Sequence, residues 1–62
     1  MLRVHTVKEC LYAVKENGRA IIEFDDSPEA DAERRALLSL HENTILAFEW
    51  RDNHSYVVVA ND

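Results

Sequence analysis

Two stretches of this chain repeat apolar residues with a helical period, and they alternate with stretches that have the two-residue period of a strand. The first helical stretch opens with Thr6 and Glu9, the spacing of a capping box. It closes at Gly18, a residue type that suits the left-handed position after a helix. Four apolar residues share one face: Val7, Cys10, Leu11 and Val14. We therefore expect an amphipathic helix between Thr6 and Gly18.

A second helix is expected to begin at Pro28. Proline is tolerated at the first helical position, and Ser27 or Asp26 before it can cap the free amide groups. The inward-facing residues are predicted to be Ala30, Leu37 and Leu40, with Ala36 beside them. Asn43 is the expected end of this helix.

The remaining segments have the pattern of strands. They cover residues 2–5, 19–25, 44–51 and 55–60. In the third of these, Leu46, Phe48 and Trp50 are expected to share one face. The last segment is apolar on both faces, and the turn before it contains Asp52 and Asn53. These two segments predict an antiparallel hairpin whose register stays open, because loops of two and three residues place opposite faces of the last strand against Trp50.

Together these elements predict an α+β fold with the order β-α-β-α-β-β, in one small domain over residues 1–62. We expect a mixed sheet of three or four strands, two helices packed on it, and a C-terminal antiparallel hairpin. Connections between parallel strands are expected to cross right-handed.

The strands carry more apolar residues than two short helices can cover. If both helices lie on one side, the other side keeps Ile21, Ile45 and Ala47, plus alternate residues of the last strand. Three arrangements are open: pairing with a second copy, binding of a different partner, or helices on opposite sides. We expect a homodimer. The predicted self-association residues are Ile21, Ile45, Ala47, Val57 and Val59, and pairing through the edge of residues 56–60 is a variant.

Charge gives a second candidate site. The chain has 7 Lys and Arg against 12 Asp and Glu, a net charge of −5, which argues against direct binding to nucleic acid. Six carboxylates lie between residues 23 and 33: Glu23, Asp25, Asp26, Glu29, Asp31 and Glu33. One interpretation is a helix start favoured by negative charge. The alternative is an acidic inhibitor, a nucleic-acid mimic that blocks the basic surface of a nucleic-acid-processing enzyme.

No catalytic or metal site is expected. Cys10 lies on the predicted apolar helix face, and the three histidines (His5, His41 and His54) lack the close spacing of a zinc-ligand pair. A single glycine argues against a phosphate-binding loop. We expect a protein that binds other proteins without catalysis and without a cofactor.

A cytoplasmic location away from membranes is also expected. No apolar run approaches the roughly 20 residues that span a bilayer, and residues 1–5 lack a long apolar core. A lone cysteine cannot form a disulfide within the chain, so the cysteine content gives no indication of secretion.

Overall fold

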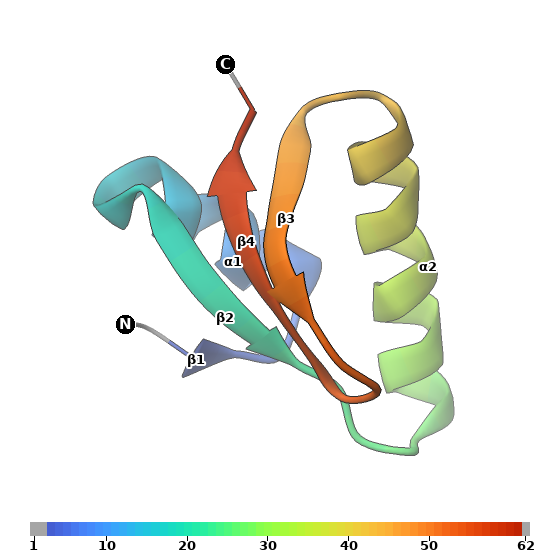
Figure 1. Cartoon of the computed structure of the whole chain (residues 1–62). Helices are drawn as coiled ribbons and strands as arrows, with labels where there is room; N and C mark the ends of the chain where they lie inside the picture. The colour runs from blue at the N-terminus through green and yellow to red at the C-terminus, as the bar shows by residue number, and fades with distance from the viewer. Residues whose placement is uncertain (1–2, 62) are drawn as a thin grey trace.

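The computed structural model describes residues 3–61, which form two helices and four strands. In chain order they are β1 (Arg3–Val4), α1 (Val7–Asn17), β2 (Arg19–Glu23), α2 (Pro28–Glu42), β3 (Leu46–Arg51) and β4 (Ser55–Ala60). The strands form one sheet in the order β1-β2-β4-β3 (Figure 1). β1 is parallel to β2, and the other two pairings are antiparallel. The predicted α+β fold is confirmed, although Leu2 of the first predicted strand lies outside the described residues.

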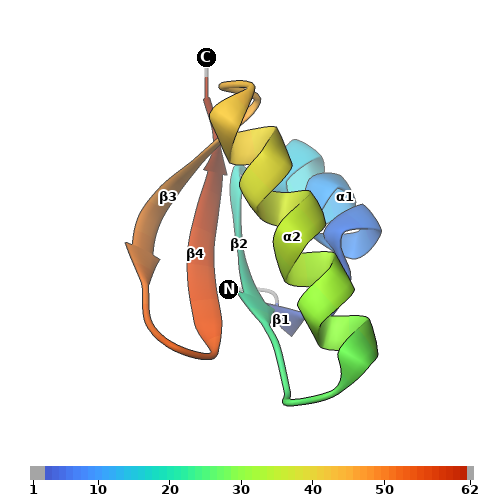
Figure 2. The same ribbon diagram turned by 90° about the vertical axis from the view of Figure 1, so that its right-hand side faces the viewer.

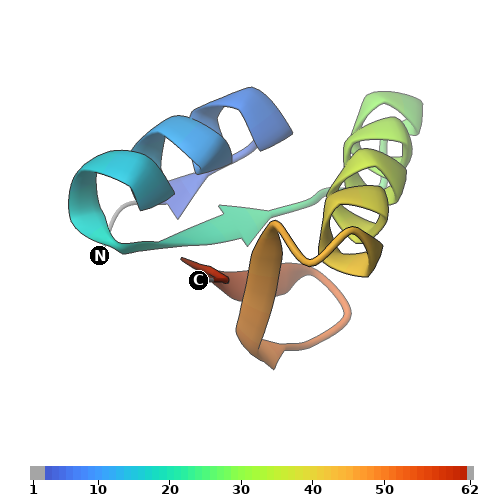
Figure 3. The same cartoon turned by 90° about the horizontal axis from the view of Figure 1, so that it is seen from above.

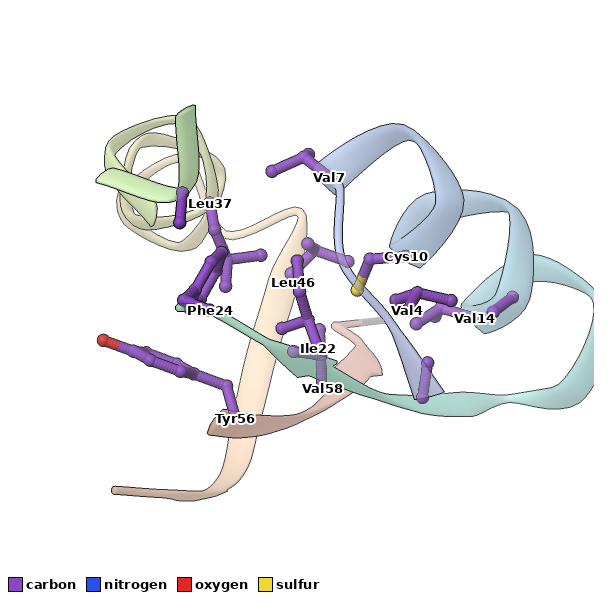
Figure 4. Packing of buried hydrophobic residues seen from close by; sticks show 13 residues of the cluster. Val4, Val7, Cys10, Val14, Ile22, Phe24, Leu37, Leu46, Tyr56 and Val58 are labelled. Atoms are coloured by element: carbon purple, nitrogen blue, oxygen red, sulfur yellow. The ribbon is translucent and has the colours of Figure 1, made fainter. Parts of the chain in front are cut away.

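Both helices lie on the same side of the sheet (Figures 2 and 3). The core fills the layer between them and the sheet, where side chains of both helices meet those of β2, β3 and β4 (Figure 4). Its largest fully buried side chains are Ile22, Leu37, Val58 and Cys10. The arrangement with helices on opposite sides of the sheet is therefore wrong. The second side of the sheet carries no helix of residues 3–61.

α1 begins and ends as expected, but it is rotated from its predicted orientation. The Thr6 hydroxyl accepts a hydrogen bond from the Glu9 amide at 3.2 Å, and Gly18 has a φ of 85°. Ala13 is fully buried, whereas Leu11 is 38% exposed. The prediction that Leu11 faces the core is wrong. The small side chain of Ala13 lets the helix lie close to β2, and this packing decides which side turns inward.

α2 also follows its local signals at both ends. Ser27 Oγ accepts a hydrogen bond from the Ala30 amide at 3.1 Å, with Pro28 in the first turn, and Asn43 is the C-terminal cap. Ala30 and Leu37 are buried on the inner face, and Leu38 and Leu40 pack against the core. Ala36 is exposed, so its predicted inward position is wrong. Leu38, on the other flank of the inner face, takes that place.

A β-bulge separates the two halves of β3. Phe48 pairs with Val58, but Trp50 pairs with Val57, so Glu49 is an extra residue opposite β4. Because the bulge shifts the alternation, Trp50 lies on the opposite face of the sheet from Phe48. The prediction that these two aromatic residues share a face is wrong.

Trp50 points away from the helices because too little space remains for it on the inner side of the sheet. Phe24, Phe48 and Tyr56 already fill it, with ring centroids 5.7 Å apart for Phe24 and Tyr56 and 4.8 Å apart for Phe48 and Tyr56. The hairpin register left open by the sequence is thereby resolved. Tyr56 and Val58 point inward, and the alternate residues of β4 point away from the helices.

β4 lies between β2 and β3 and is hydrogen-bonded to both. The variant in which copies pair through the edge of residues 56–60 is therefore wrong, since β4 has no free edge. The edge strands of the described sheet are β1 and β3.

Candidate interaction surface

The face of the sheet opposite the helices, here called the outer face, is the candidate interaction surface. Side chains alternate between the two faces of β2 and β4. Ile22 and Val58 point inward and are buried, so the adjacent residues Ile21 and Val57 point outward, onto the outer face. In the pairing register, Arg3, Ile21, Val57 and Trp50 form one row across all four strands. Three of these four side chains are apolar.

A second row lies beside the first. Arg19 pairs with Val59, which pairs with Ala47. Ile45 precedes β3 on the same alternation and is 51% exposed. The structure thus brings the five predicted self-association residues together on one face, namely Ile21, Ile45, Ala47, Val57 and Val59.

Trp50 also belongs to this surface, although the alternation of residues 44–51 did not predict it. Its side chain is 54% exposed, on the strand next to Val57. Regular alternation in β3 assigned it to the core, and only the bulge at Glu49 brings it to the outer face. Tryptophan is enriched at interaction surfaces and often contributes a large share of the binding energy.

Two ion pairs lie on the outer face, one at its rim and one across the central strand β4. Arg3 Nη1 lies 3.5 Å from Glu23 Oε2, between β1 and β2. Arg19 Nη2 lies 3.0 Å from Glu49 Oε1, and this pair connects β2 with β3 across the intervening β4. All four side chains are at least one-third exposed, so each pair contributes little to the stability of the fold. They give the outer face both signs of charge.

Much of the acidic segment makes contacts within the chain. The Glu33 carboxylate accepts a hydrogen bond from the Val7 amide at 2.7 Å, at the start of α1. Asp25 accepts a hydrogen bond from the Ser27 amide at 2.9 Å, and hydrogen bonds from Ser27 hold the pKa of Asp25 below its usual value.

The other four acidic residues of the segment differ in their contacts. Asp31 pairs with Arg35 at 3.2 Å, and Glu23 belongs to the rim pair with Arg3. Asp26 and Glu29 are exposed. Glu23, Asp25, Glu29 and Glu33 line a shallow hollow of about 270 Å³ together with His5, Thr6, Ser27 and Ala30. Four of the six predicted acidic residues therefore form hydrogen bonds or ion pairs within this chain, namely Glu23, Asp25, Asp31 and Glu33.

Cys10 and His41 each contact the interior of the fold. Cys10 is fully buried, and burial raises the pKa of its thiol to about 11, which keeps it protonated at neutral pH. His41 Nδ1 lies 3.2 Å from the Leu46 carbonyl oxygen, and its ring stacks on Phe48 with centroids 4.3 Å apart. Within residues 3–61, no group of three or more His, Cys, Asp or Glu side chains is placed to hold a metal ion.

No protein-family model matches this chain, and no match was found among curated proteins or solved structures. In the part of the chain that the structure describes, neither helix is long and apolar enough to cross a membrane.

Proposed function

We propose that this protein is a small acidic interaction module that forms a homodimer through its outer face and acts by binding rather than by catalysis. One observation carries the proposal: both helices lie on the same side, so no helix of residues 3–61 covers Ile21, Val57 and Trp50 on the other side. Apolar surface of this kind is stabilised by contact with another protein.

A second copy suits this surface better than an unrelated partner does. The outer face combines apolar side chains with basic and acidic ones, Arg3 and Arg19 with Glu23 and Glu49. A surface with both charges can be complementary to itself under two-fold symmetry. The small size of the domain favours the same conclusion, because chains of about 60 residues often gain stability from a second subunit.

The expected affinity is modest. Covering roughly 400 Å² of apolar surface corresponds to about 10 kcal/mol before the costs of association. Stable interfaces usually cover about 800 Å² on each partner, so this surface is at the small end of the range. We expect dissociation constants in the micromolar range.

The acidic segment is the weaker candidate for a partner-binding site. An inhibitor that mimics nucleic acid presents its charges to a basic partner. Here Glu33 and Asp25 accept hydrogen bonds from backbone amides, and Asp31 pairs with Arg35. Arg35 offsets the charge of Asp31, and acceptor oxygens of Glu33 and Asp25 are occupied by amides of this chain, so fewer of them are free to bind a basic protein.

Sedimentation equilibrium over a range of micromolar concentrations tests the homodimer. The wild-type mass is expected to rise from 7.2 kDa toward twice that value. Val57→Asp places a charge in the centre of the outer face and is expected to keep the mass at 7.2 kDa throughout.

Ala36→Asp is the matched control, because Ala36 is exposed on α2, away from the outer face. It is expected to associate as the wild type does. Circular dichroism establishes that both variants are folded. A wild-type mass of 7.2 kDa at every concentration would overturn the proposal.

A further inference from the structure

We infer that the two copies are related by a two-fold axis that runs parallel to β4, midway between the two outer faces, so that β2 of each copy faces β3 of the other. This inference rests on the proposed homodimer and specifies its geometry. It starts from the strand order, in which β4 has β2 on one side and β3 on the other. A rotation of 180° about an axis parallel to β4 exchanges the positions of these two neighbours in the facing copy.

The apolar residues of the outer face are centred on β4. Val57 lies between Ile21 of β2 and Trp50 of β3 in a single row. After the rotation, Ile21 of one copy faces Trp50 of the second copy, and Val57 lies near its own symmetry mate. A large indole against a shorter aliphatic side chain, repeated on both sides of the axis, fills the space of about 10 Å between two stacked sheets.

The ion pair between Arg19 and Glu49 points to the same axis. Within one chain the guanidinium reaches across β4 to the carboxylate of the β3 bulge, 3.0 Å away. The rotation brings Arg19 over β3 of the second copy, where the second copy's Glu49 lies. Each arginine can then exchange its own Glu49 for the other copy's. The number of ion pairs stays the same, and Val59, which lies beneath the intrachain pair in the register, becomes free to contact the other sheet.

A two-fold axis that lies between the two sheets but runs perpendicular to the strands is less favourable. Applied along the row of Ile21 and Val57, it places each residue of that row opposite itself. Arg3 at the end of the row would then face Arg3 of the second copy, and like charges across an interface oppose association.

A charge-exchange experiment distinguishes these geometries. Arg19→Glu and Glu49→Arg each create two like charges within one chain and across their own homodimer. Mixed in equal amounts, the two variants restore both pairs only between different chains. Random pairing gives as much heterodimer as both homodimers together. We expect the ratio of heterodimer to homodimers to exceed this statistical ratio by about five- to tenfold, a modest preference in keeping with weak surface pairs. Native mass spectrometry with one variant isotopically labelled measures this ratio.

The matched control uses Arg35→Glu and Glu16→Arg, whose residues are exposed on the helices and carry the same changes of net charge. Their mixture is expected to stay close to statistical, because both residues lie on the helices, away from the outer face. Any preference in this mixture measures the general attraction between oppositely charged chains, which is the same in both experiments. If the wild type forms dimers but the variants at 19 and 49 also mix statistically, the axis along β4 is wrong while the homodimer stands. A disulfide between two Trp50→Cys chains would likewise overturn this axis, because it requires Trp50 to face itself. If the wild type forms no dimer, the proposed function itself fails.

Discussion

Thr44 holds a backbone position that favours glycine. It follows the C-terminal cap of α2 with a φ of 59°, in the left-handed region. Its amide donates to the His41 carbonyl at 3.0 Å, and the Ile45 amide donates to the Leu40 carbonyl at 3.2 Å. These two bonds are the pattern of a Schellman motif, whose left-handed residue is usually glycine because a Cβ atom is strained there. A β-branched side chain makes the conformation less favourable still.

Thr44→Gly is therefore expected to stabilise the protein. Relief of the strain is partly offset by the greater freedom of glycine in the unfolded chain, which leaves a gain of about 0.5–1 kcal/mol. For a domain of this size that corresponds to a rise of about 3–6 °C in the melting temperature. Thr44→Ala removes the β-branch but retains the Cβ atom, and it is expected to raise the melting temperature by less. An equal rise in both variants would show that removal of the hydroxyl and methyl groups, and not the backbone, is responsible.

At the scale of elements, the helix ends were predictable and the helix orientations were less so. Thr6, Ser27 and Gly18 act through hydrogen bonds or dihedral angles within a few residues, so their roles can be read from the local sequence. The rotation of α1 toward Ala13 and the bulge at Glu49 depend on packing against other elements, and neighbouring residues in the sequence carry no signal for them.

The start of α1 also depends on a residue that is remote in sequence. Glu33 of α2 accepts a hydrogen bond from the Val7 amide, one of the free donors of the first turn, and its negative charge lies near the positive end of the helix dipole. Because it joins the two helices, this contact stabilises their packing as well as the end of α1.

Glu33→Ala is expected to reduce the free energy of unfolding by about 1 kcal/mol, as loss of a helix cap usually does. Glu33→Gln keeps an oxygen acceptor without the charge and is expected to lose less. Urea unfolding measures both, and faster hydrogen exchange at the Val7 amide would locate the effect. Glu29→Ala, in the exposed first turn of α2, is the control. Equal losses from Glu29→Ala and Glu33→Ala would contradict a specific role for the Glu33 contact.

On the scale of the whole molecule, two helices against one side of a four-stranded sheet produce an asymmetric layer about 30 × 24 × 19 Å in extent. The sequence indicated the surplus of apolar strand residues, because alternation in residues 19–25 and 44–51 is a local property. It left open which side the helices occupy, since that depends on how both connections cross the sheet. Five residues of the outer face were therefore predictable, whereas Trp50 was not.

Trp50 is the single tryptophan of the chain, so its fluorescence reports directly on the outer face. In the dimer its indole moves from water into an apolar contact, and the emission maximum is expected to shift to shorter wavelength as the protein concentration rises. Quenching by iodide should weaken over the same range. Val57→Asp, which removes the apolar centre of the surface, is expected to give an emission maximum that does not depend on concentration. If sedimentation shows a dimer while wild-type emission stays constant, the copies meet elsewhere, and the exposed Leu11 and Tyr12 of α1 would become the next surface to alter.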